Sequence, residues 1–274
     1  MFEQCVRNVY EKTPLIHCIT NYVTVNDVAN TLLAGGGSPI MADDEEDAVE
    51  ITSICHGLVI NIGTLNQRTI PAMFSTGKRA NELSHPVILD PVGAGASKLR
   101  TDVTFKLLEE VKFSVIRGNI SEIKTVSQGT GTTKGVDADA GDAVTENNLD
   151  ETITWAKQLS QKTGAVIVIT GAIDIVTDAN KAYVIRNGHS MMAKVSGTGC
   201  MLTAIIAAYC AANPDHHLEA AAAAVSLFGL AGELAYDKLV KNDAGPSSYR
   251  TYLIDAISKI DAATLKGGMK IETR

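Results

Sequence analysis

Two glycines and a cysteine precede a long alanine-rich run in the segment 195–201. The run contains strong helix formers and no breaker until an Asn-Pro pair, so we expect a helix that begins near Thr198. The first N–H groups of a helix have no partner within it, and with the helix dipole they favour a phosphate or a developing oxyanion. The pattern therefore predicts an anion site lined by Gly197, Gly199 and Cys200.

Cys200 lies inside the field of this predicted helix start. A helix N-terminus favours thiolate over thiol, so the sequence predicts a lowered pKa and a cysteine that can act as a base or as a charged partner. The alternative is a glycine-lined packing contact beside a buried, inert cysteine. The motif alone is equally compatible with both interpretations, and the other predicted strand ends favour the chemical one.

Polar residues follow three further apolar runs of the sequence. Asp90 precedes a glycine-containing loop, Arg117 and Glu122 follow the next run, and Thr170-Gly171 follow a third. In parallel sheets ligands bind outside the carboxyl ends of the strands, so we expect these residues to lie together. The charged residues also have a purely structural interpretation. Asp90 and Glu122 could be charges that stabilise helix N-termini, and Arg117 could be a surface cation.

Phosphoryl transfer is the chemistry that this set of residues suits. Mg²⁺ takes one or two carboxylates, keeps several waters and binds substrate phosphates, so Asp90 and Glu122 are enough for a magnesium site. The transferred group also needs positive charge and aligned donors, which Arg117 and the predicted helix start would supply. Thr170 and Gly171 would place a hydroxyl and bare backbone beside a nucleotide.

Other phosphate and metal motifs do not occur in the sequence. It contains no Gly-x-x-x-x-Gly-Lys-Ser/Thr loop, which disfavours a P-loop kinase. The glycines within 129–135 have the wrong spacing for a dinucleotide fingerprint, and the aspartates within 137–142 match only part of a calcium loop. We expect 129–148 to be an exposed loop. His17 suggests a Cys-His pair with its neighbour, but a core histidine with satisfied hydrogen bonds is the preferred interpretation.

The elements that position these residues follow from short apolar runs alternating with longer amphipathic segments, a pattern typical of a parallel sheet covered by helices. Strands are expected at 15–19, 39–41, 58–62, 87–89, 113–116, 166–169, 173–177 and 182–186. The last two are joined by a short polar turn and predict an antiparallel edge hairpin. After residue 187 we expect helices at about 198–212, 218–238 and 248–263, with no further strand.

The predicted fold class is therefore α/β, a layered domain with a mostly parallel central sheet, helices on both faces and an edge hairpin. The chain has 274 residues, 45% of them hydrophobic, which fits a single domain over 1–274 with a substantial core. The alanines at 220–224 predict close helix packing and possible contacts between subunits.

Charge and cysteine content restrict the partners. A net charge of −7 argues against nucleic acid and anionic membrane surfaces as partners. Five cysteines with no metal-ligand spacing suit a reducing compartment, so we expect a cytoplasmic protein. The most apolar run, around 220–231, is flanked by glutamates and is too short to span a bilayer. We expect neither export nor a membrane anchor.

Four motifs taken together resemble the ribokinase-like superfamily: Asp-Pro-Val-Gly-Ala-Gly at 90–95, Arg-Gly-Asn-Ile-Ser-Glu-Ile at 117–123, Thr170-Gly171, and Gly-Thr-Gly-Cys at 197–200. The segments 14–27 and 36–41 resemble, more narrowly, the hydroxyethylthiazole kinase family. This resemblance runs in order from about Pro14 to the final helices and covers nearly the whole chain.

The resemblance implies phosphorylation of the hydroxyl of 4-methyl-5-(2-hydroxyethyl)thiazole by ATP with Mg²⁺, a salvage step that feeds thiamine synthesis. It also implies a homotrimer whose thiazole pockets form between neighbouring subunits. The residue roles that it implies are Asp90 and Glu122 for magnesium, Arg117, Thr170, Gly171 and Gly199 for ATP, Asn26, Met41 and Gly197 for the thiazole alcohol, and Cys200 for catalysis.

Three other functions share parts of this pattern. They are a ribokinase-like kinase for another small alcohol, an ATP- or ADP-dependent dehydratase of hydrated NAD(P)H, and a nucleotide-binding regulator without turnover. Most ribokinase-like enzymes have Asp where this chain has Cys200, whereas thiazole kinases have the cysteine, so this position favours the thiazole kinase. The identity of the general base stays open. The alcohol proton can be taken by Cys200, or it can leave late, toward the phosphate, with Cys200 shaping the anion hole.

Overall fold

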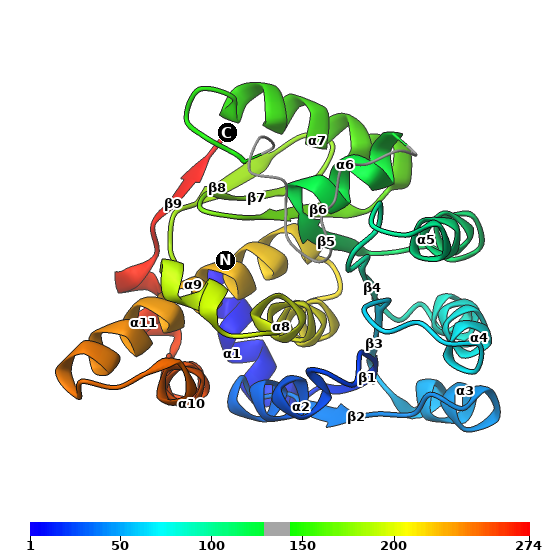
Figure 1. The fold of residues 1–274 in the computed structure, drawn as a ribbon, viewed down its shortest axis with the longest axis horizontal. Helices are drawn as coiled ribbons and strands as arrows, with labels where there is room; N and C mark the ends of the chain where they lie inside the picture. The colour runs from blue at the N-terminus through cyan, green and yellow to red at the C-terminus, as the bar shows by residue number, and fades with distance from the viewer. Residues whose placement is uncertain (129–142) are drawn as a thin grey trace.

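The computed structural model describes residues 1–128 and 143–274, and its centre is a nine-stranded sheet (Figure 1). The predicted loop at 129–148 therefore lies largely outside the described residues. The strand order is β2-β1-β3-β4-β5-β6-β7-β8-β9, and the pairs from β2 to β6 are parallel while those from β6 to β9 are antiparallel. The strands are β1 Leu15–Ile19, β2 Ser38–Ile40, β3 Gly57–Asn61, β4 Val87–Asp90, β5 Val115–Asn119, β6 Val166–Thr170, β7 Asp174–Thr177, β8 Ala182–Ile185 and β9 Ile271–Thr273.

Helices cover both faces of this sheet (Figure 1). Two apolar clusters lie between the layers, one beneath α1, α2, α8, α9 and α10, the other beneath α3 to α7. The helices are α1 Phe2–Lys12, α2 Val25–Ala34, α3 Glu45–Ile54, α4 Thr69–Glu82, α5 Lys98–Glu110, α6 Ile120–Gln128, α7 Leu149–Thr163, α8 Thr198–Ala212, α9 His217–Lys241, α10 Pro246–Ile257 and α11 Ala262–Gly268. Because both faces are covered, β3 and β4 are buried along their whole length and read as apolar runs.

The predicted α/β architecture is confirmed, including every one of the eight predicted strands, although several of their ends shift. The β7–β8 hairpin is antiparallel, as expected. Its turn is held by Asp178, whose Oδ1 accepts from the backbone N–H groups of Asn180 and Lys181, each at 2.7 Å. This is the local hydrogen bonding that makes aspartate a frequent turn residue.

Two predictions for the C-terminal third were wrong. A ninth strand, β9, follows the helices and pairs antiparallel with β8, with Ile185 opposite Ile271. Three residues are too few to show a period, and β9 forms because β8 offers an unpaired edge. The single helix expected at 248–263 is two helices, since Asp261 caps a new one by accepting from the N–H of Thr264 at 2.7 Å.

The helix α9 is long and apolar enough to cross a membrane by length and composition, but 83% of its apolar window is buried inside the protein. It is a core helix. The alanines at 220–224 have no exposed surface within this single chain. They pack helix against helix as predicted, and they leave no area for the subunit contacts that were also expected of them.

Candidate active site

The carboxyl ends of four neighbouring strands bring polar side chains together. Asn61 ends β3 and lies opposite Asp90 at the end of β4, while Asn119 ends β5 and lies opposite Thr170 at the end of β6. The start of α8 faces these strand ends through Cys200 and Thr203, whose side chains contact Asn61 and Asp90. The predicted meeting of strand ends and helix start is therefore observed.

Close backbone approach explains the two glycines at the start of α8. Gly197 has φ +85°, and a Cβ there would lie 2.2 Å from Cγ2 of Thr24. A Cβ at Gly199 would lie 2.4 Å from Nη1 of Arg117. Only glycine accommodates both the left-handed backbone and these contacts. The guanidinium consequently lies against the positive end of the α8 dipole, where two sources of positive potential add.

Asp90 is fully buried and uses only one of its carboxylate oxygens. Oδ2 accepts from Nδ2 of Asn61 and from Oγ1 of Thr203, both at 2.9 Å. Oδ1 has no hydrogen-bond partner among the described residues and lies 3.6 Å from Nη1 of Arg117. Burial raises the pKa of Asp90 against the opposing effect of the arginine. The open oxygen is available to a ligand.

Arg117 also keeps unused hydrogen-bonding capacity. Its side chain is 11% exposed, and Nη2 donates to Oγ1 of Thr170 at 2.7 Å. Nε is buried and has no partner within the described part of the chain. A planar guanidinium with spare donors beside unpaired helix N–H groups is suited to phosphate.

Glu122 lies in the first turn of α6 and is 3% exposed. Its two oxygens each accept a backbone N–H at 2.8 Å, Oε1 from Gly93 and Oε2 from Asn119. Burial and repulsion by Asp90 nevertheless raise the pKa of Glu122 to about 7. The carboxylate of Asp90 is thus close enough to disfavour the charged form of Glu122.

A hard divalent cation fits this pair of carboxylates. Asp90 has an unpartnered buried oxygen, each oxygen of Glu122 keeps a lone pair, and a cation would relieve their mutual repulsion. No group of three or more His, Cys, Asp or Glu side chains that could hold a metal occurs at residues 1–128 or 143–274. The two carboxylates alone match the way Mg²⁺ binds, with waters and phosphate oxygens as the remaining ligands.

Cys200 is 8% exposed and accepts two N–H groups, from Nδ2 of Asn61 at 3.2 Å and Nδ2 of Asn21 at 3.3 Å. Burial and the nearby carboxylate of Asp90 raise its pKa to about 11, although Arg117 and the two amides oppose this. The predicted lowering of this pKa was wrong, because desolvation and repulsion exceed the attraction of the helix N-terminus.

The remaining predicted residues lie at different distances from this cluster. Thr170 contacts Arg117, and Gly171 follows it at the exposed end of β6. Met41 directly follows β2 and is half-buried. Asn26 is exposed on the first turn of α2 and accepts a hydrogen bond from Asn30 at 3.0 Å. It is not part of the buried cluster within one chain.

Sequence reasoning missed three members of the cluster, Asn21, Asn61 and Thr203. The strand was predicted to run to residue 62, so Asn61 was placed inside it, whereas β3 ends at Asn61. The rule that found Asp90 would also have found Asn61 had the strand been ended correctly. Asn21 stands in the motif that resembles the thiazole kinases, two residues after β1.

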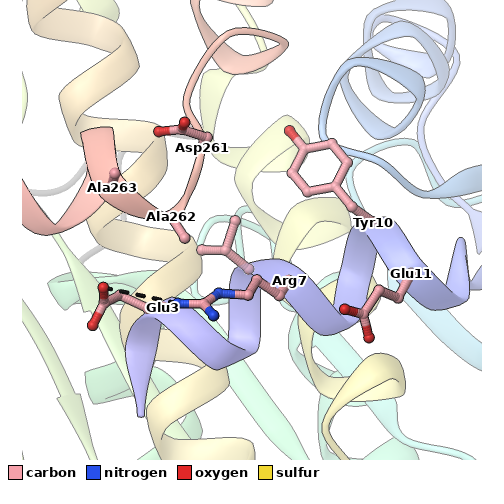
Figure 2. Close-up of a pocket in the computed structure, with 8 residues that line it drawn as sticks. Glu3, Arg7, Tyr10, Glu11, Asp261, Ala262 and Ala263 are labelled. Carbon is pink, nitrogen blue, oxygen red and sulfur yellow. Dashed lines mark ion pairs between the residues drawn. The ribbon is translucent and has the colours of Figure 1, made fainter.

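Two features elsewhere carry no comparable chemistry. His17 is fully buried, with Nε2 bonded to the carbonyl of Ala42 and Nδ1 to Oγ1 of Thr52, both at 2.8 Å, which confirms the satisfied core histidine. A hollow of about 420 Å³ between α1 and the start of α11 contains the Glu3–Arg7 ion pair and Asp261 (Figure 2). None of the predicted site residues lines it.

Comparison with known proteins gives consistent matches. The sequence model of the "Hydroxyethylthiazole kinase family" matches residues 6–263. A hydroxyethylthiazole kinase of Clostridium acetobutylicum is 59% identical over 273 residues, which covers 100% of both chains. The solved structure of a hydroxyethylthiazole kinase from Pyrococcus horikoshii OT3 superposes with a TM-score of 0.88 at 33% identity and covers 100% of this chain and 98% of that one.

A ribokinase-like superfamily protein of Enterococcus faecalis V583 superposes with a TM-score of 0.60 at 14% identity, over 90% of this chain and 87% of that one. At this identity the likeness concerns the fold alone. The predicted ribokinase-like architecture is confirmed.

Proposed function

Because this chain belongs to the hydroxyethylthiazole kinase family, we propose that it transfers the γ-phosphoryl group of ATP to the hydroxyl of 4-methyl-5-(2-hydroxyethyl)thiazole. One observation carries the proposal beyond the family likeness. The guanidinium of Arg117 and the start of α8 form a positive site directly beside two buried carboxylates. Phosphoryl transfer requires this combination of an anion site and a place for a divalent cation.

The phosphates of ATP lie, in this proposal, across the N-terminus of α8. The free N–H groups at Gly199 and Cys200 and the spare donors of Arg117 bind the transferring group and stabilise the charge of its equatorial oxygens. Thr170 orients the guanidinium through its hydroxyl, and Gly171 leaves room for the nucleotide at the exposed end of β6. Asp90 and Glu122 would hold Mg²⁺, which when bound neutralises charge on the phosphates.

Cys200 orients the substrate hydroxyl in this proposal and does not remove its proton beforehand. With a pKa raised to about 11, the thiol keeps its own proton at neutral pH. The alcohol proton then leaves late, toward the transferred phosphate, which is compatible with the loose transition state of phosphoryl transfer. The sulfur and Gly197 form the wall against which the hydroxyl aligns.

The thiazole ring contacts Met41 and Asn26 in this proposal, in a pocket between neighbouring subunits of a homotrimer. The exposure of Asn26 supports a role that a single chain does not fulfil. Tyr22 and Val23 are 78% and 61% exposed next to Asn21 of the buried cluster, so apolar surface adjoins the site. Apolar exposure of this kind is typical of a surface that another protein surface covers.

The cellular setting follows from the same assignment. The product would enter thiamine synthesis as a salvaged precursor, in the cytoplasm, with the chain acting as one catalytic domain over residues 1–274. A net charge of −7 supports small-molecule substrates in place of nucleic acid.

The test is Mg²⁺-dependent ADP release from ATP by purified protein, with products identified by mass. Hydroxyethylthiazole is compared with hydroxymethylpyrimidine, pyridoxal, ribose and hydrated NADH. We expect phosphorylated thiazole as the main product. Phosphorylation of a different alcohol would move the protein to another ribokinase-like kinase, and dehydration of hydrated NADH would make it a lyase.

A further inference from the structure

We propose that Asn21 and Asn61 are positioning residues, whose paired side-chain amides fix the sulfur of Cys200 relative to the carboxylate of Asp90. The inference rests on the proposed function, because it assigns these amides a part in the same phosphoryl transfer. Both asparagines are buried, at 5% and 2% exposure, so solvent does not satisfy their amides and their partners must lie within the protein.

Backbone groups determine which way each amide points. Oδ1 of Asn61 accepts from the backbone N–H of Gly63 at 2.9 Å, and Oδ1 of Asn21 accepts from the backbone N–H of Thr24 at 3.2 Å. A backbone N–H can only donate, so the oxygen of each side chain must face it. The NH₂ group of each asparagine is therefore turned toward Cys200.

The sulfur consequently accepts two hydrogen bonds from fixed donors. Nδ2 of Asn61 and Nδ2 of Asn21 reach Sγ of Cys200 at 3.2 and 3.3 Å, and the amides are joined by a 3.1 Å bond from Asn21 to Oδ1 of Asn61. A thiol that accepts two such bonds cannot direct its own proton toward either amide. The S–H group is left to point toward the carboxylate of Asp90, whose pKa the thiol lowers, and toward the adjoining space where the substrate hydroxyl would lie.

Asn61 also ties the sulfur to the carboxylate. The same Nδ2 group that reaches Cys200 donates to Oδ2 of Asp90 at 2.9 Å. One planar amide thus sets the separation between a residue of α8 and a residue of β4. With Oδ2 held by Asn61 and Thr203, Oδ1 is the oxygen left open.

Asn21 connects this arrangement to the start of α8. Its Oδ1 accepts from Oγ1 of Thr24 at 3.0 Å, and Thr24 is the residue against which Gly197 packs. A shift of Asn21 would therefore disturb both the sulfur and the helix start. The network contains no spare donor or acceptor at either amide, since each oxygen accepts two bonds and each NH₂ donates two.

The first test is a set of kinetic constants for Asn61→Asp and Asn21→Asp. Each variant keeps the size and one acceptor oxygen of the side chain, but replaces the NH₂ donor to Cys200 with a carboxyl oxygen and adds an ionisable group beside it. Because misplacement by about 1 Å can cost on the order of 100-fold, we expect kcat for thiazole to fall by about 10- to 100-fold. KM for ATP should stay within about threefold for Asn21→Asp, since the hydrogen bonds of Asn21 go to Asn61, Cys200 and Thr24 and to neither Asp90 nor Arg117. Equal changes in both constants would overturn the assignment.

A double-mutant cycle separates positioning from general damage. If Asn21 acts through the sulfur, Asn21→Ala should lower kcat much less in a Cys200→Ala background than in the native protein. Independent, multiplicative losses would contradict the proposal. The same cycle measured on the free energy of unfolding in urea, without ATP or metal, should also be non-additive, which tests the contact whatever the protein phosphorylates.

Asn213→Ala is the matched control. Asn213 is 4% exposed and donates to the carbonyls of Tyr209 and Cys5 at the opposite end of α8. This variant should lower the stability of the fold and leave kcat unchanged. A wild-type protein inactive on thiazole would refute the proposed function, whereas an active wild type whose asparagine variants match this control would refute only the positioning role.

Discussion

Burial has a larger effect than residue type on the pKa values of the side chains in this site. Asp90, Glu122 and Cys200 all have raised pKa values, because loss of solvent outweighs the nearby arginine. In the absence of ligand the site thus disfavours negative charge on its own residues. It is prepared to receive the negative charge of a phosphate and the positive charge of a cation together.

Replacement of Cys200 tests the role of the thiol. Cys200→Ala should lower kcat by about 10- to 100-fold, because an aligning contact to the hydroxyl is lost, and should leave KM for ATP nearly unchanged. Steady-state kinetics with varied ATP and varied thiazole distinguish the two constants. Equal losses in both would place Cys200 in nucleotide binding instead.

Neutralisation of Glu122 tests the proposed magnesium site. Glu122→Gln removes a charge and puts an NH₂ group against one of two backbone N–H donors, from Gly93 and Asn119. We expect the Mg²⁺ concentration for half-maximal activity to rise and the stability to fall by about 1–3 kcal/mol. Magnesium titrations of activity and urea unfolding measure the two effects. An unchanged titration would remove Glu122 from the metal site.

His17 should make the stability depend on pH. Burial lowers its pKa below the ordinary value of 6.5, so the unfolded chain takes up the proton first as the pH falls. The contribution of neutral His17 is complete above pH 6.5 and is lost below it, by at most about 1.4 kcal/mol per pH unit.

The measurement for His17 is urea unfolding at pH 7.5 and 5.5 for the native protein and for His17→Gln. The difference between the proteins is needed because Glu122, whose pKa is raised to about 7, changes stability in the opposite direction. We expect the variant to lose less stability on acidification. The same loss in both proteins would show that His17 does not titrate in this range.

The residues that sequence predicted and those that it missed differ in one respect. Asp90, Arg117 and Cys200 carry distinctive chemistry at recognisable positions. Asn61 is an ordinary amide whose importance depends on which neighbours it meets, and only the register of β3 against β4 shows them. The prediction of a lowered pKa for Cys200 failed for a similar reason, since the burial that raises this pKa is a property of the folded chain.

The elements around the site repeat this contrast. The helix α8 begins at Thr198 and ends at Ala212, as predicted, because its signals are local: glycines before it and an Asn-Pro pair after it. β9 has no such signal and depends on the edge of β8. Elements defined by their own residues were predictable, whereas an element defined by its partner was not.

Two glycines with positive φ, Gly197 at the start of α8 and Gly164 at the end of α7, offer a test of element geometry. Gly164→Ala should cost about 1 kcal/mol, because its φ is +73° but no atom lies within 4 Å of the new Cβ. Gly197→Ala should cost more and lower kcat, since its Cβ would overlap Thr24. Urea unfolding and activity measure both. Adding Thr24→Ser, which removes Cγ2, should recover part of the loss, and equal effects of the two glycine variants would contradict this account.

At the scale of the whole molecule, the proposed trimer makes a prediction about mixed subunits. Cys200→Ala and Asn26→Ala chains should each be weakly active alone. If one pocket takes Cys200 and Asn26 from different subunits, random mixing should restore about a quarter of the sites. Activity after co-expression, with the mass of the assembly from light scattering, measures this. No recovery in a verified mixed trimer would place both residues in one subunit's pocket.

The ninth strand has a consequence for production of the protein in cells. β8 pairs with β7 on one side and with β9 on the other. The β9 residue Ile271 lies 86 residues after its partner Ile185, so this second pairing forms only when the C-terminus has been synthesised. Until then one side of the hairpin presents unpaired backbone groups to other nascent chains. Shortening the chain to residue 268 should therefore favour insoluble aggregates, and a soluble fusion attached after β9 should be tolerated better than one that replaces it.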